Sequence, residues 1–128
     1  MIPAMKMTLD GIDEHNLVTR LDSGVVGIGD REYRSSVVVC ASAVIEDWPV
    51  RQVSDLAAGL EAVLALRPDI LVLGTGEVQD FPPPELLARV AGRRVGLEVM
   101  DNRAACRTYN VLRAESRNVV LALIQPSG

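Results

Sequence analysis

The second half of the chain alternates strand-like and helix-like segments, and this alternation limits the fold more than any other feature. Apolar runs at 70–73, 95–100 and 119–124 are typical of buried strands. Between them, residues 84–92 begin with a proline suited to a first helical turn, and residues 102–115 repeat apolar side chains at helical spacing. This order is typical of parallel βαβ units with right-handed crossovers. The sequence therefore predicts an α/β domain with a βαβαβ C-terminal half.

The first half of the chain predicts short strands followed by one helix. Strand patterns occur at 17–21, 25–28, 37–40 and 43–45, and helical spacing runs from 53 to 64. The strands before residue 46 suit hairpins, which would extend or cover the C-terminal core. We therefore expect one three-layer domain over residues 1–128. It would have a mixed central sheet, with helices on one face and extra N-terminal β-hairpin structure on the other.

Composition favours a globular protein that binds neither nucleic acid nor lipid. Hydrophobic residues make up 48% of the chain and charged residues 23%. A net charge of −4 gives no general attraction for phosphate backbones, and 3% aromatic residues offer few surfaces for base stacking. No apolar run reaches the roughly 18 residues of a membrane span, and the first residues lack the apolar core of a signal peptide. We expect a cytoplasmic protein without membrane insertion.

Metal and cofactor sites have few ligands to draw on. His15 is the only histidine, and Cys40 and Cys106 do not form a metal-binding motif. In a reducing cytosol the two cysteines would be separate thiols. The expectation is a protein with no metal and no cofactor.

Potential chemistry gathers at one edge of the predicted sheet. The loop Gly74-Thr75-Gly76 and the turn Asp101-Asn102-Arg103 both follow strands, and loops at the carboxyl ends of parallel strands form ligand sites. Glycines on both sides of Thr75 permit close backbone approach, so the amides could cradle a small anion. The same glycines also suit a purely structural turn. An anion cradle and a structural turn are therefore two hypotheses for this loop.

The predicted helix over 102–115 carries the remaining candidates. With Asn102 as its cap, Arg103, Arg107 and Asn110 lie on the face away from the sheet, where solvent or a partner would meet them. Cys106 lies at the border of this face and would be either a nucleophile beside two arginines or a packed small hydrophobe. Asp101 would be a general base, an anchor for Arg103 or Arg107, or a second cap, and the anchor is favoured because surface carboxylates beside arginines usually form ion pairs.

Phe81 precedes three prolines, Pro82-Pro83-Pro84, which form a stiff entry to the helix at 84–92. Such a segment is either a rigid loop or a support that presents one aromatic contact to a partner.

Ordered landmarks run through most of the chain: Ser36–Val39, Trp48, Leu71–Gly76, Phe81–Leu86, Glu98–Asp101, Ala104–Asn110 and Glu115–Arg117. In these segments the chain resembles a widespread family of small conserved domains whose members include the mitochondrial complex I assembly factor 3 and an adipogenesis-associated protein. The family pattern usually reads Asp-Thr where this chain has Asp101-Asn102, and Glu-Gly-Arg where it has Glu115-Ser116-Arg117. The resemblance implies a layered α/β architecture and an assembly-type role.

Two functional hypotheses follow. The first is a non-enzymatic, assembly-factor-like module that binds a protein partner through the arginine-bearing helix face and the Phe81 loop. The second is a small-molecule or anion site, with Cys106 or Asp101 as the catalytic residue if a reaction occurs. The residues of the second site would be Gly74–Gly76 and the segment from Asp101 to Arg107. The first is favoured, because no complete catalytic constellation is present in the sequence.

Overall fold

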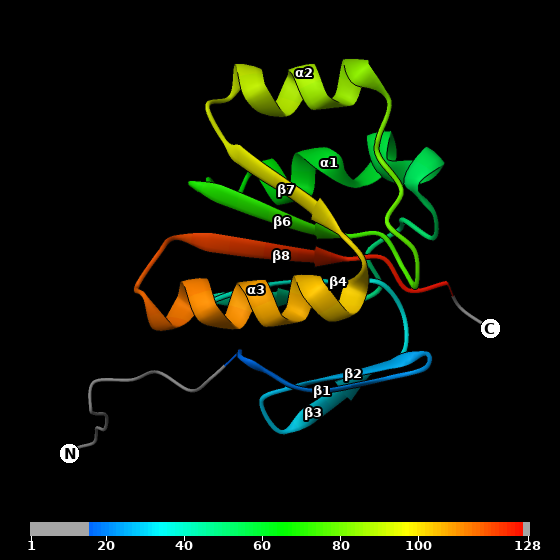
Figure 1. Ribbon diagram of the computed structural model, residues 1–128, viewed down its shortest axis with the longest axis vertical. Coiled ribbons are helices and arrows are strands. Elements are labelled where there is room, and N and C mark those ends of the chain that lie inside the picture. Colours follow the sequence, from blue (N-terminus) through cyan, green and yellow to red (C-terminus); the bar gives the residue numbers. More distant parts are fainter. Residues whose placement is uncertain (1–15, 127–128) are drawn as a thin grey trace.

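The computed structural model describes residues 16–126, which form two sheets and three α-helices (Figure 1). The strands are β1 (Val18–Asp22), β2 (Val25–Ile28), β3 (Arg31–Tyr33), β4 (Val37–Cys40), β5 (Ala43–Ile45), β6 (Ile70–Gly74), β7 (Gly96–Met100) and β8 (Val119–Leu123). The helices are α1 (Leu56–Leu64), entered through a 3₁₀ turn at Val53–Asp55, α2 (Pro84–Gly92) and α3 (Asn102–Ala114).

The central sheet has five strands in the order β5-β4-β8-β6-β7. Strands β6, β7 and β8 run parallel, whereas β4 is antiparallel to both of its neighbours. The mixed sheet and the βαβαβ half predicted from the sequence are therefore confirmed.

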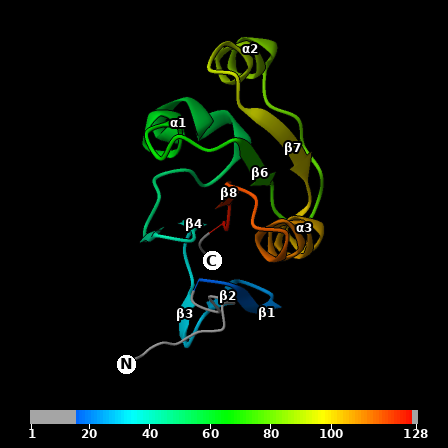
Figure 2. The same ribbon diagram turned by 90° about the vertical axis from the view of Figure 1, so that its left-hand side faces the viewer.

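The helices lie on both faces of this sheet, which corrects the expectation that they share one face. Apolar residues of α1 and α2 join one core, and those of α3 join another core with the small sheet. Figure 2 shows α1 and α3 on opposite sides of the strands. The reason is the strand order: the chain steps outward from β6 to β7, then returns past β6 to β8. Right-handed crossovers made in opposite directions place their helices on opposite faces.

Trp48 locks α1 onto its face of the sheet. Its indole Nε1 donates to the carbonyl oxygen of Gly59 at 2.9 Å, and the tryptophan is almost fully buried. A Cβ added at Gly59 would lie 2.5 Å from that nitrogen and 2.6 Å from a methyl of Val50. The glycine is thus required for this close approach.

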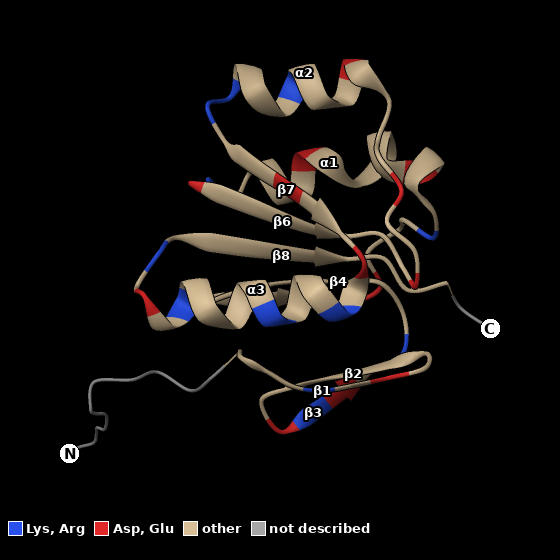
Figure 3. Ribbon diagram, in the orientation of Figure 1, with Lys and Arg blue, Asp and Glu red and all other residues tan. Residues whose placement is uncertain are grey.

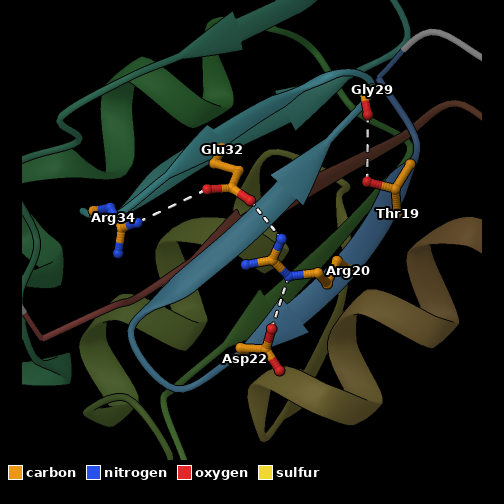
Figure 4. A network of polar contacts seen from close by, with 6 residues as sticks. All are labelled: Thr19, Arg20, Asp22, Gly29, Glu32 and Arg34. Atoms are coloured by element: carbon orange, nitrogen blue, oxygen red, sulfur yellow. Dashed lines mark hydrogen bonds and ion pairs between the residues drawn. The ribbon is translucent and has the colours of Figure 1, made fainter.

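The second sheet is an antiparallel meander, β1-β2-β3, packed on the α3 side. Its strands are joined by two-residue turns at Ser23-Gly24 and Gly29-Asp30, and it includes β3, a strand that was not predicted from the sequence. Its outward face carries an ion-pair network in which Arg20 contacts Asp22 and Glu32 (Figure 4). These exposed pairs add little stability, because solvent screens them.

Side chains of α3 hold β1 in place. The Asn110 amide accepts from the Val18 amide at 3.0 Å and donates to the Val18 carbonyl at 2.7 Å, as a neighbouring strand would. The Tyr109 hydroxyl donates to the carbonyl of Asn16 at 2.7 Å, and Arg113 donates to both. Asn110 was expected to face solvent or a partner, but its side chain instead joins α3 to β1 of the small sheet.

All three helices end in a left-handed residue that is not glycine. Arg67, Arg94 and Ser116 have φ values of 57°, 61° and 61°. At the end of α3, Ser116 donates to the carbonyl of Arg113 and Arg117 donates to that of Leu112, both at 3.0 Å, which is the Schellman pattern. Gly92 is the last helical residue of α2, and the left-handed position after it is taken by Arg94.

Candidate functional site

The carboxyl ends of β6 and β7 form the point where the strand order reverses. The chain leaves β6 towards α2 on one face and leaves β7 towards α3 on the other. Such a point is where open α/β sheets bind ligands. Here the two exits are joined directly: the Thr75 amide donates to the Met100 carbonyl at 3.0 Å, and the Asn102 amide donates to the Gly76 carbonyl at 2.8 Å.

The Asn102 side chain ties three strand ends together. Its Oδ1 accepts from the Gly76 amide and its Nδ2 donates to the Ile124 carbonyl, both at 2.9 Å. A Cβ at Gly74 would lie 2.4 Å from that Oδ1, so glycine there makes room for the amide. Gly76 has a φ of 106°, which favours glycine on conformational grounds. Thr75, Gly76 and Asn102 thus direct their backbone amides at internal partners rather than at an open cradle.

Asp101, not Asn102, caps α3. Its Oδ1 accepts from the Ala104 amide at 2.9 Å, while Asn102 is already the first helical residue. Of the three roles considered for Asp101, the structure places it in the cap. Within the described residues it makes no ion pair with Arg103 or Arg107.

Cys106 is packed among apolar side chains on the α3 face of the sheet and is 6% exposed. Burial raises the pKa of this thiol to about 12, and the nearby charge of Arg103 opposes the shift only in part. At neutral pH the group is therefore a neutral thiol and a poor nucleophile. Cys40 lies in the core on the other face, so the two thiols are separated by the sheet.

The loop between β6 and α2 projects two apolar side chains into solvent. Val78 is 73% exposed and Phe81 is 63% exposed. The loop is held in shape by Thr75, whose hydroxyl donates to the Val78 carbonyl at 2.7 Å and accepts from the Asp80 amide at 3.0 Å. The Gln79 side chain also donates to the Val99 carbonyl at 2.8 Å. Residues 77–81 are called the docking loop below.

Sequence reasoning found Phe81 through its prolines but missed Val78 and Gln79. Nothing in the local sequence marks Val78 as exposed or Gln79 as reaching the edge strand β7. An exposed apolar residue next to charged ones is not unusual in a loop, so only the three-dimensional placement identifies the pair.

The outward side of α3 carries an exposed row of residues spaced by four, Arg103, Arg107 and Val111, called the α3 stripe below. Val111 is 55% exposed. Neither Arg103 nor Arg107 makes an ion pair with any residue in the 16–126 range, in contrast to Arg89 and Arg93, which both bind Glu61. Figure 3 shows basic residues along α3 and acidic residues in the β6–α2 loop and at the start of α2.

Two surface hollows of about 490 and 570 Å³ lie elsewhere, beside Ser35 and Asp47, which line both. They contain none of the candidate site residues from the sequence, although Ser36 and Trp48, two landmarks of the family resemblance, line the smaller one. One wall holds a buried polar pair that sequence reasoning missed: the Ser36 hydroxyl accepts from the Gln125 amide at 2.8 Å. The Ser36 hydroxyl also donates to the Val50 carbonyl, and the Gln125 side-chain amide donates to the carbonyls of Tyr33 and Ser35. This pair fastens the end of β8 to the start of β4.

Two negative findings apply to residues 16–126 alone. No helix there is long and apolar enough to cross a bilayer. No cluster of three or more histidine, cysteine, aspartate or glutamate side chains there could hold a metal ion. His15 lies outside the described residues.

Known proteins of similar sequence match most of this chain. A model of the family described as "Protein of unknown function (DUF498/DUF598)" matches residues 18–124. The "13 kDa major membrane protein" of Francisella tularensis is 33% identical over 104 residues, covering 78% of this chain and 81% of that protein. The NADH dehydrogenase (ubiquinone) 1 alpha subcomplex assembly factor 3 of Xenopus tropicalis is 32% identical over 111 residues. This alignment covers 84% of this chain but 60% of the assembly factor, which is the longer protein.

Solved structures give the same picture. The NMR structure of a Xanthomonas campestris protein is 36% identical and superposes with a TM-score of 0.81. The match covers 98% of this chain and 94% of that chain. The resemblance noted in the sequence and the α/β architecture that it implied are both confirmed.

Proposed function

Because this chain belongs to the DUF498/DUF598 family, whose relatives include complex I assembly factors, we propose that it is a non-enzymatic protein-docking module with an assembly-factor-like role. The partner binds the exposed side of α3 and the docking loop. Family membership alone carries little functional information, whereas the chemistry of this surface supports binding directly.

The observation that carries the proposal is the exposed apolar pair Val78 and Phe81 on a loop that is already held in shape. Exposed apolar side chains on small domains mark interaction sites when they gather on one element. The three hydrogen bonds that hold the loop mean that binding would order few groups, which lowers the entropic cost of association. An aromatic anchor on such a support is typical of a residue that contributes strongly to a protein interface.

Unpaired arginines support the same surface. Arg103 and Arg107 remain exposed without an ionic partner in the described part of the chain. Arginine is enriched at protein interfaces because its planar fork binds carboxylates in a defined geometry. Acidic side chains of the partner would therefore contact α3.

The alternative, a small-molecule or anion site with catalysis by Cys106, is less well supported. The amides of Thr75, Gly76 and Asn102 donate to protein acceptors, so an anion would have to displace them. A neutral, buried Cys106 thiol gives no nucleophile at neutral pH. We place the module in the cytoplasm, where two free thiols would stay reduced.

The test is affinity purification of the tagged chain from its native organism, with quantification of co-purifying proteins. Phe81→Ala and Arg107→Ala should lose a recovered protein while melting at nearly the unchanged temperature. Arg51→Ala is the matched control, because Arg51 is exposed but belongs neither to the α3 stripe nor to the docking loop. Equal recovery of the co-purifying protein with all three variants would show that neither Phe81 nor Arg107 takes part in binding it.

A further inference from the structure

The exposed apolar side chains fall into two groups with opposite charged neighbours. Val78 and Phe81 of the docking loop lie among the acidic residues Glu77 and Asp80. Val111 of the α3 stripe follows Arg103 and Arg107, one and two turns earlier on the same face. The docking loop therefore combines apolar contacts with acidic residues, and the α3 stripe combines Val111 with two arginines before it, Glu115 being exposed one turn after it.

Neither group is neutralised within the described chain. The docking-loop carboxylates and the stripe arginines make no ion pair in residues 16–126, although surface carboxylates and arginines elsewhere in the molecule do so. Repulsion between Arg103 and Arg107, four residues apart on one helix, costs a little stability that a bound anion would relieve.

The two groups flank the same edge of the central sheet. The Gly76 carbonyl and amide bind the backbone and side chain of Asn102, so the docking loop begins where α3 begins. Figure 1 shows the loop leaving the sheet at the end where α3 starts. An acidic group and a basic group therefore begin at the same end of the sheet, and each includes exposed apolar side chains.

A surface made of two complementary neighbouring halves is self-complementary under a two-fold rotation. We propose that a second copy of this chain occupies the docking surface, with the docking loop of each copy against the α3 stripe of the other. Val78 and Phe81 then contact Val111 across the interface, while Glu77 and Asp80 face Arg103 and Arg107. This inference rests on the proposed function, because it identifies one partner of the same surface.

The dimer is expected to be weak and sensitive to salt. One short loop and two to three helical turns on each side form an interface at the low end of the usual size range, roughly below 1,200 Å² in total. Charge pairs at the rim are screened within about 8 Å at physiological ionic strength. Association should therefore increase with protein concentration and weaken as salt is added.

The test is sedimentation velocity on the full chain with charge-reversal variants. Wild type should shift from monomer to dimer with rising concentration, and Arg107→Glu or Asp80→Arg alone should remain monomeric. An equimolar mixture of these two variants should dimerise again. One contact in the mixed dimer then has the wild-type pair, and the other has the pair in reversed order. Arg51→Glu reverses an exposed charge outside the proposed interface, so this variant should dimerise like wild type.

Thermal melts of each variant exclude unfolding as the cause of a monomeric result. A wild type that stays monomeric at every concentration, a dimer that survives either reversal, or a mixture that stays monomeric would overturn the inference. The proposed function would fail separately, through unchanged recovery of co-purifying protein with Phe81→Ala and Arg107→Ala. A monomeric chain whose recovered partner is still lost in those variants leaves the docking proposal intact.

Discussion

Replacing Asn102 by alanine should destabilise the fold more than its position at a helix start suggests. The side chain makes two hydrogen bonds of 2.9 Å, one from the Gly76 amide and one to the Ile124 carbonyl. Both partners are buried, Ile124 being 1% exposed. Asn102→Ala removes both bonds and leaves one donor and one acceptor without a protein partner.

The size of the effect follows from that geometry. A buried polar group left unsatisfied costs about 1–3 kcal/mol. Asn102 itself is half-buried, so water can reach part of the space that its side chain leaves, and the lower part of that range applies to each group. We expect the free energy of unfolding to fall by about 2–3 kcal/mol, with no change in secondary structure.

Urea denaturation followed by circular dichroism measures this change directly. Asn118→Ala is the matched control, because Asn118 is exposed and its amide makes a single bond of 3.0 Å to the Arg67 carbonyl. Its loss should cost less than about 1 kcal/mol. Equal effects of the two substitutions, or an unchanged midpoint for Asn102→Ala, would refute the role given to Asn102.

Three further changes test other parts of the structure. Ser116→Gly should raise stability by about 0.5–1 kcal/mol, since the left-handed strain at φ 61° outweighs the entropy cost of glycine, and a lower melting temperature would contradict this. Gly59→Ala should lower stability by about 1–3 kcal/mol and alter Trp48 fluorescence, whereas Gly92→Ala, with open space around the added carbon, should not; equal melts would show that the contact is not tight. Cys106 should react slowly with iodoacetamide at neutral pH in a Cys40→Ser background, and rapid labelling below about pH 6 would indicate a nucleophile instead. Folding raises the pKa of the Cys106 thiol from 9.0 to about 12, so the unfolded chain loses this proton at a lower pH than the folded chain does. The stability that the neutral thiol supplies is therefore complete below pH 9 and is lost as pH rises towards 12. The difference in unfolding free energy between wild type and Cys106→Ala should shrink over that range.

Local sequence signals predicted the elements but not their neighbours. The apolar runs and helical spacing predicted β6, α2, β7, α3 and β8 nearly within their observed bounds, because each pattern depends on the face that a segment buries. The position of α3 depended on strand order, which no local pattern records. With β8 beside β6 instead of beyond β7, the crossover had to reverse direction and its helix had to change face.

The candidate site shows the same division between local and distant causes. Asp101 and Asn102 are equally suited to cap a helix, and only the distant Gly76 and Ile124 engage Asn102 elsewhere. Asn110 lies on the outward side of α3 by helical spacing, yet Val18, far earlier in the chain, uses both atoms of its amide. Arg103 and Arg107 form no ion pair with any segment in residues 16–126, and they are exposed as helical spacing predicted.

The polar groups at the carboxyl edge of the sheet hold β6 to α3, which leaves the outer surface for binding. Amide NMR spectra of the full chain during titration with inorganic phosphate can distinguish this arrangement from an open anion cradle. The amides of Gly76, Asn102 and Ala104 should keep their chemical shifts and exchange slowly with solvent. Saturable shifts at these three amides, together with fast exchange before phosphate is added, would show an open anion cradle instead.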